Sequence, residues 1–159
     1  MARRFAKIHV AIWNDADFRS LSAMEQHLYL VLISQARISL CGVLDYFPSR
    51  WAICCDEWTQ SDVERLVKGL TGRRYVSVDY DTSELLIRSF IRRDEVMKAK
   101  TVAVGAATDY GEVMSDKLRA TIDKELIRVF KEEPELAGWQ GLRDANPVLF
   151  RRVTEGASK

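Results

Sequence analysis

The stretch from Trp51 to Phe90 constrains the fold more than any other part of the chain, because it combines two helical patterns with two strand patterns in direct succession. Residues 50–55 have the length of a short helix, and the pattern from Ser61 to Leu70 is that of a longer amphipathic helix. Residues 75–78 and 85–88 then predict two strands around a polar turn. Few folds place helix, turn, helix and hairpin in this order.

The second helix of this stretch carries a start pattern and two distinct faces. Ser61 and Glu64 fit a capping box, in which each side chain satisfies an otherwise unpaired backbone N–H. Apolar residues at helical spacing form the inner face, which comprises Val63, Leu66, Val67 and Leu70. The sequence therefore predicts an α+β fold of the winged helix-turn-helix type, in which three helices and a small antiparallel sheet present this helix to a DNA groove.

Composition and charge narrow the class of protein. The chain has 159 residues, of which 47% are hydrophobic and 30% charged, as in a soluble globular domain with a core. The formal net charge is only +1, so a nucleic-acid surface has to be a local patch. No apolar run is long enough for a bilayer, and the start of the chain lacks a signal-peptide core. Three cysteines, two of them adjacent, favour a reducing cytoplasmic setting.

The segments before this stretch complete the expected domain. Alternating apolar residues at 8–12 suggest a short strand or an extended arm packed on the domain. Ser22 and Glu25 form a capping-box pattern that opens a helix over about residues 23–36. Residues 42–46 predict a short strand that pairs with the hairpin as its third strand.

Two further helices are expected after the hairpin, over residues 95–110 and 115–131. The first contains the small residues 102–107, which permit close contact with another helix. These helices serve either dimerisation or packing against the first domain. The predicted organisation is a winged helix-turn-helix domain with an N-terminal arm at 1–93, a helical extension at 94–139 and a flexible tail at 140–159.

The candidate DNA-binding residues are polar or basic side chains of the second helix, the hairpin flanks and the N-terminal arm. Side chains placed to read base edges are Gln60, Ser61, Glu64 and Arg65. Side chains placed to contact phosphates are Lys68, Arg73, Arg74, Arg92, Arg93 and Lys98. Arg3 and Arg4 of the arm are placed for a contact in the minor groove.

The acidic residues of the same region support a different interpretation, in which these charges are only a solvated helix face. Asp62 and Glu64 favour the helix dipole but repel phosphate. Asp79, Asp81 and Glu84 make the tip of the hairpin acidic, and the simplest expectation for them is a solvated turn that does not enter DNA.

Patterns for catalysis or metal binding are scarce, so we predict neither an enzyme nor a cofactor. His9 and His27 belong to no nucleophile or metal motif, and phosphate-binding glycine loops are absent from the sequence. The alternative is a zinc site built from the adjacent pair Cys54-Cys55 with Cys41 and His27. The spacing disfavours it, because adjacent cysteines ligate one ion with poor geometry.

Four segments carry a resemblance to known proteins: Trp13 to Ser22 (WNDADFRSLS), His27 to Tyr29, Cys41 to Asp45 (CGVLD) and Leu85 to Arg92 (LLIRSFIR). Over roughly residues 7–136 the chain resembles winged-helix proteins of actinobacterial phages, and is similar to the N-terminal domain of phage replisome organisers and replication initiators. The resemblance implies a non-enzymatic protein of the bacterial host cytoplasm that binds double-stranded DNA in replication initiation or transcription regulation. It also implies replication or transcription proteins as partners, and a homodimer. The short C-terminal region departs from longer organisers and argues against helicase loading.

One alternative function stays open. The near-neutral net charge and the acidic hairpin tip also suit a winged-helix module that binds a host or phage protein without DNA.

Overall fold

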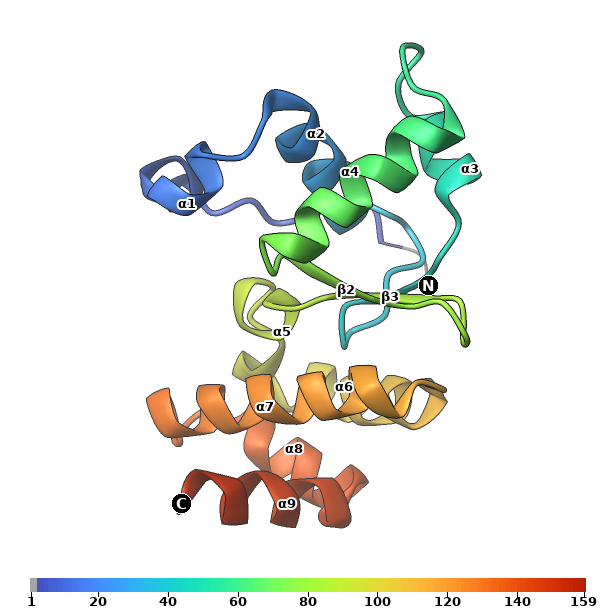
Figure 1. Ribbon diagram of the computed structural model, residues 1–159. Coiled ribbons are helices and arrows are strands. Elements are labelled where there is room, and N and C mark those ends of the chain that lie inside the picture. Colours follow the sequence, from blue (N-terminus) through green and yellow to red (C-terminus); the bar gives the residue numbers. More distant parts are fainter. Residues whose placement is uncertain (1–2) are drawn as a thin grey trace.

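The computed structural model describes residues 3–159 and shows an α+β protein in which a three-stranded antiparallel sheet lies between two groups of helices (Figure 1). The sheet consists of β1 (Val43–Asp45), β2 (Val76–Asp79) and β3 (Glu84–Ile87). The helices on one side are α1 (Ala16–Arg19), α2 (Ala23–Ile33), α3 (Pro48–Ala52) and α4 (Gln60–Gly72). Those that follow the hairpin are α5 (Phe90–Arg93), α6 (Lys100–Glu112), α7 (Asp116–Glu132), α8 (Gly138–Ala145) and α9 (Pro147–Ala157).

The strand order is β1-β3-β2, with Val43 opposite Leu86 and Val76 opposite Ile87. The predicted hairpin and its third strand are thereby confirmed. The element order α2-β1-α3-α4-β2-β3 is compatible with a winged helix, followed here by further C-terminal helices.

Helix α2 begins as the sequence predicts. The Ser22 hydroxyl accepts a hydrogen bond from the Glu25 backbone N–H at 3.2 Å, and the Glu25 carboxylate accepts one from the Ser22 N–H at 2.8 Å. Tyr29 of this helix is buried and lies edge-on to Phe18 of α1 and to Tyr75 ahead of β2. These aromatic contacts join α1 and α2 to the sheet.

Helix α4 begins earlier than its predicted capping box. The N-cap is Thr59, whose hydroxyl accepts from the Asp62 N–H at 3.2 Å, while Asp62 accepts from the Thr59 N–H at 2.9 Å. The predicted Ser61–Glu64 box is wrong, because Ser61 already lies in the first turn. The buried Trp58 precedes the cap and fixes the entry of the chain, so the first of two overlapping cap patterns is used.

The structure differs from two further predictions on either side of this region. Of the two alternatives for residues 8–12, the strand does not form, and Val10–Asn14 is a short 3-10 helix, η1. The chain before it is an arm packed on the domain, where His9 hydrogen-bonds to the Arg93 carbonyl at 2.7 Å. The helix expected over residues 95–110 is divided into a 3-10 turn, η2 (Val96–Lys98), and α6. The division lies at Ala99, whose backbone is extended, and Glu95, with a left-handed φ of 58°, separates η2 from α5 before it.

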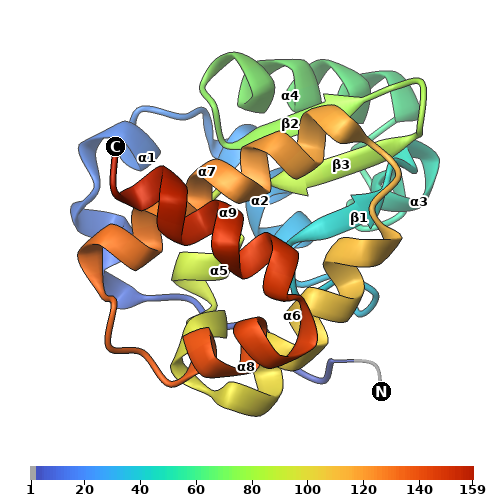
Figure 2. The ribbon, with the colours of Figure 1, turned by 90° about the horizontal axis from the view of Figure 1, so that it is seen from below.

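The C-terminal region is larger and more ordered than a two-helix extension with a flexible tail. Within residues 140–159 the chain completes α8 and forms α9, which bury Leu142, Leu149 and Val153 (Figure 2). The Asn-Pro pair that suggested a tail is a helix start, since Asn146 caps α9 by accepting from the Leu149 N–H at 3.0 Å.

The small residues of α6 pack inside the chain. Ala103, Ala106 and Ala107 are buried, and α8 lies against α6 with Gly138 and Gly141 at the close approach. The stretch that suggested a dimer contact is therefore occupied by a helix of the same chain. Among the described residues, none of the helices combines the length and the apolar character needed to cross a membrane.

Candidate nucleic-acid interface

Helix α4 presents a polar outer face above a buried apolar stripe. Val63, Leu66, Val67 and Leu70 are buried, as the helical spacing predicts. Four of the predicted DNA-binding side chains on the opposite face are exposed, namely Gln60, Ser61, Arg65 and Lys68, and Glu64 is half-buried. The structure thus brings these five side chains together on one surface.

Contacts within α4 reduce the free charge of this face. The Arg65 guanidinium pairs with Asp62 at 3.0 Å, and the Gln60 amide donates to Glu64 at 2.9 Å. Hydrogen bonds from the Thr59 backbone and hydroxyl, with a further one from Arg65, lower the pKa of Asp62 to about 2. Asp62 is therefore ionised at neutral pH and offsets the positive charge of Arg65 in their ion pair. Lys68 forms no ion pair within residues 3–159.

The two arginines that follow α4, Arg73 and Arg74, differ in whether they form an ion pair. Arg73 pairs with Asp17 of α1 at 2.8 Å and donates to the Ser20 hydroxyl, and the Tyr75 hydroxyl also donates to Asp17 at 3.0 Å. These hydrogen bonds, that of Arg73 first, lower the pKa of Asp17. Arg73 therefore fastens α1 to the end of α4, while Arg74 is exposed and without an ion pair in the described chain.

Most of the remaining predicted cations also form ion pairs with other residues of the chain. Arg92 lies 3.5 Å from Glu125, Arg93 lies 3.6 Å from Asp15, Lys98 pairs with Glu95 at 2.6 Å and Arg3 pairs with Asp94 at 2.9 Å. Of the nine predicted cations, six are in ion pairs, and within residues 3–159 three are not: Arg4, Lys68 and Arg74. Residues 1 and 2 of the predicted arm lie outside the described part.

The acidic hairpin tip is not a solvated turn at Asp79 and Glu84. Glu84 is buried and accepts from the backbone N–H groups of Met114 at 3.0 Å and Ser115 at 2.8 Å, while the Ser115 hydroxyl donates to Asp79 at 2.5 Å. These carboxylates bind the N-terminal end of α7, where helix N–H groups lack partners of their own. The hairpin is thus docked on α7, and of its three acidic residues only Asp81 is exposed.

Helix α7 supplies a basic face that the sequence analysis did not assign. Its apolar side is buried at Leu118, Ile122, Leu126 and Val129. The exposed side carries basic residues spaced by seven, four and three positions, which are Lys117, Lys124, Arg128 and Lys131. That spacing is helical, so the basic face can be recognised from the sequence once the bounds of the helix are known.

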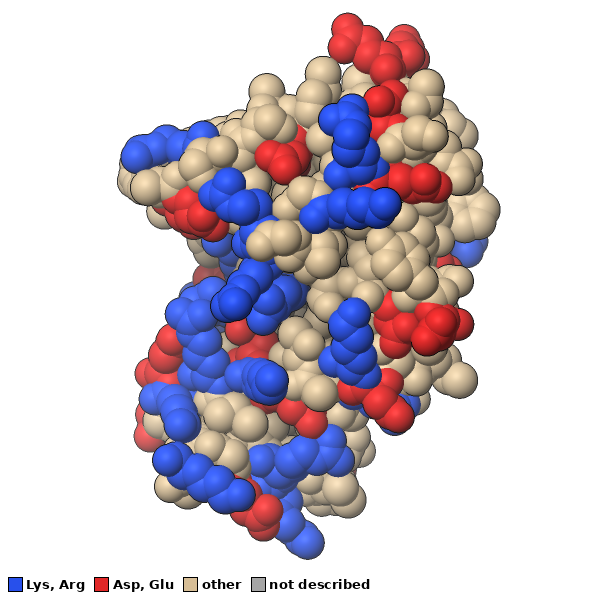
Figure 3. All heavy atoms as spheres, in the orientation of Figure 1, with Lys and Arg blue, Asp and Glu red and all other residues tan. Residues whose placement is uncertain are grey.

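The basic residues of both helices face the same side of the molecule. Figure 3 shows Lys and Arg side chains in a band that runs from the end of α4 over α5 to α7. Arg128 is paired with Glu132 at 2.9 Å, and Lys117 donates to the Val78 carbonyl at 2.7 Å. Lys124 and Lys131 have no ion pair within residues 3–159, so they are the freest cations of α7.

The cysteines and histidines form no metal site in the described chain. Residues 3–159 contain no group of three or more potential His, Cys, Asp or Glu ligands. Cys41 is buried, its thiol donates to the Ala106 carbonyl at 3.1 Å, and Cys54 is exposed. The zinc alternative therefore has no cluster of ligands to support it here.

Comparison with known proteins gives no match to the chain, whether with protein-family models, with curated proteins or with solved structures.

Proposed function

We propose that this chain is a winged helix-turn-helix protein that binds double-stranded DNA, with α4 as the recognition helix. The observation that supports this most is the exposed face of α4, which carries Gln60, Ser61, Arg65 and Lys68 on a helix held by a buried apolar stripe. The element order and the strand order β1-β3-β2 agree with the proposal. Through the resemblance noted above, we place this activity in phage-type replication initiation or transcription regulation, without an enzymatic step.

The two basic helices divide the task in this proposal. Gln60, Ser61 and Arg65 are suited to base edges in the major groove, because amide, hydroxyl and guanidinium groups match the donors and acceptors there. Lys68, with the cations of α7, contacts phosphates and orients the domain. The docked hairpin does not enter DNA, since Asp79 and Glu84 hold it on α7.

The experiment is a fluorescence-anisotropy titration of labelled duplex DNA with the wild type and with Arg65→Ala/Lys68→Ala. We expect the variant to bind about tenfold or more weakly, since it loses two cations of the recognition face. Both side chains are exposed, so the fold is retained and far-UV circular dichroism checks this. Equal affinity of the two proteins would contradict the role of α4.

One observation favours a second candidate, a protein-interaction module with the same fold. Six of the nine predicted cations are occupied in ion pairs, which leaves less free charge for phosphate. A pull-down from host lysate treated with nuclease separates the two functions, because a protein partner survives the treatment and a DNA-bridged one does not.

A further inference from the structure

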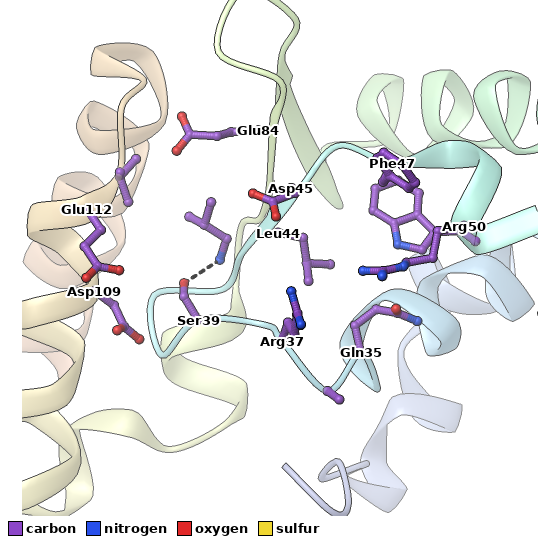
Figure 4. Close-up of a pocket in the computed structure, with 14 residues that line it drawn as sticks. Gln35, Arg37, Ser39, Leu44, Asp45, Phe47, Arg50, Glu84, Asp109 and Glu112 are labelled. Carbon is purple, nitrogen blue, oxygen red and sulfur yellow. Dashed lines mark hydrogen bonds between the residues drawn. The ribbon is translucent and has the colours of Figure 1, made fainter. Parts of the chain in front are cut away.

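A cavity of about 650 Å³ lies away from the basic face, between the end of α2, β1, α3 and the end of α6 (Figure 4). Its volume is in the range of sites for small ligands and short peptide segments. None of its lining residues belongs to α4 or α7, so occupation of this cavity does not depend on DNA binding.

Positive charge lies at one end of the cavity. Arg37 and Arg50 both direct their guanidinium groups into it, and neither has an ion pair within residues 3–159 (Figure 4). The guanidinium of Arg50 lies over the ring of Phe47, 5.7 Å from its centroid. Trp51, which also lines the cavity, is only 1% exposed. Because guanidinium groups bind carboxylates and phosphates by charge-assisted hydrogen bonds, the two arginines favour an anionic group at this end.

Negative charge lies toward the opposite side. Glu112 of α6 and Asp45 of β1 are exposed carboxylates without ion pairs in the described chain, and Figure 4 places Glu112 across the cavity from Arg50. Asp109 on the same side is already occupied, since it accepts from the Leu40 N–H at 2.6 Å. The cavity is therefore suited to a ligand that carries both charges at separate points.

The wall formed by β1 is an open edge of the sheet. Tyr46 donates its N–H to the Ser83 carbonyl of the neighbouring chain segment at 2.7 Å. Along an antiparallel strand, residues that bond to the neighbouring strand alternate with residues whose N–H and C=O point away from it. The N–H and C=O of Asp45, the residue before Tyr46, therefore point away from β3. Hydrogen bonds between Val43 and Ser39 cover the start of this edge. The N–H and C=O of Asp45 are left for an added extended segment, as in peptide recognition by strand addition.

We propose that this cavity binds an extended peptide segment of a partner protein. An acidic side chain of the peptide lies between Arg37 and Arg50, and a basic side chain lies at Asp45 and Glu112. The peptide backbone pairs with the free edge of β1. A small anion would use only the arginine end, whereas an extended peptide matches both charged ends and the strand edge.

The test is a selection from a random library of short peptides displayed on phage, with the full chain immobilised. We expect enriched peptides that carry an acidic and a basic residue on either side of an apolar one. A synthetic copy of an enriched peptide should bind Arg37→Glu/Arg50→Glu about tenfold or more weakly than the wild type. The matched control Lys124→Glu/Lys131→Glu, with the same change of charge outside the cavity, should keep the wild-type affinity.

A second variant, Asp45→Lys/Glu112→Lys, keeps the proposal testable if the first one unfolds. Selection on this variant should enrich peptides whose basic residue is replaced by an acidic one. The proposal is overturned if no peptide is enriched over the bare support. It is also overturned if the enriched peptides bind both cavity variants as tightly as the wild type, or if the control loses affinity to the same extent.

Discussion

Glu84 shows how one carboxylate decides the placement of a whole helix. It lies at the start of β3, is buried, and accepts hydrogen bonds from two consecutive N–H groups ahead of α7. In the sequence it is one of three acids in a polar turn, and nothing local distinguishes it from Asp81. Its role depends on residues about thirty positions later, which are out of reach of any local pattern.

Replacement of Glu84 by Gln should destabilise the protein by about 1–3 kcal/mol, because one of the two N–H groups loses its acceptor and faces an amide N–H₂ instead. Urea unfolding followed by circular dichroism measures the change. Asp81→Asn is the matched control, since Asp81 is exposed at the same tip, and it should leave the free energy of unfolding nearly unchanged. Equal effects of the two substitutions would show that Glu84 does not hold α7.

The thiols of Cys41 and Cys54 should differ in their reactivity toward alkylating reagents. Burial, with a smaller effect of Asp109, raises the pKa of the Cys41 thiol to about 12. At pH 8 Cys41 therefore has almost no reactive thiolate, whereas Cys54 is exposed. Mass spectrometry after brief iodoacetamide treatment at pH 8 should find Cys54 modified and Cys41 modified only after unfolding. Rapid modification of Cys41 in the folded protein would contradict its burial among α6 residues.

At the scale of elements, most of the chain up to the end of β3 could be predicted, because its patterns are local. The apolar stripes of α2 and α4 and the three strands follow from residue spacing and turn residues. The errors lie where two local patterns compete or where a single backbone angle decides. Thr59 and Ser61 both fit a cap, and the extended backbone of Ala99 divides the helix expected over residues 95–110.

The start of α4 can be tested by two substitutions. Thr59→Ala should cost about 1 kcal/mol of stability, because it removes the hydroxyl that accepts from the Asp62 N–H. Ser61→Ala should change the free energy of unfolding by less than about 0.5 kcal/mol, since Ser61 is exposed within the first turn. Thermal or urea unfolding of the two variants distinguishes them, and the reverse order would restore Ser61 as the cap.

At the scale of the whole molecule, the C-terminal helices could not be predicted as they are. The sequence of residues 140–159 has glycines and an Asn-Pro pair, which locally suggest a tail. Its order comes from packing, because Gly138 and Gly141 let α8 approach the backbone at Met97 and Lys100. The exposure of the outer face of α4 could be predicted from residue spacing, and its role in DNA binding stays a prediction. The ion pairs of Arg73, Arg92 and Arg93 could not be predicted, because they join elements that are distant in sequence.

Substitution of two glycines by alanine tests how closely α8 packs against α6, because Gly141 lies at this contact and Gly111 does not. At Gly141 an added Cβ meets the Lys100 carbonyl, so Gly141→Ala should destabilise by about 1–3 kcal/mol. At Gly111 of α6 nothing lies within 4 Å of an added Cβ, so Gly111→Ala should be neutral or stabilise by about 0.5–1 kcal/mol. Differential scanning calorimetry gives both values, and an unaffected Gly141→Ala would mean that α8 does not pack closely here.

The central claim is that α4 and α7 together bind duplex DNA, and the salt dependence of binding tests it most directly. Anisotropy titrations over a range of salt concentrations should give an affinity that falls linearly on a log–log plot. Lys124→Ala/Lys131→Ala should reduce the magnitude of the slope by about 1 for each lost phosphate contact, because fewer counterions are released. The cavity variant Arg37→Ala/Arg50→Ala should keep the wild-type slope. A wild-type affinity that is absent or independent of salt, or a slope that is equal in the α7 variant, would contradict the account.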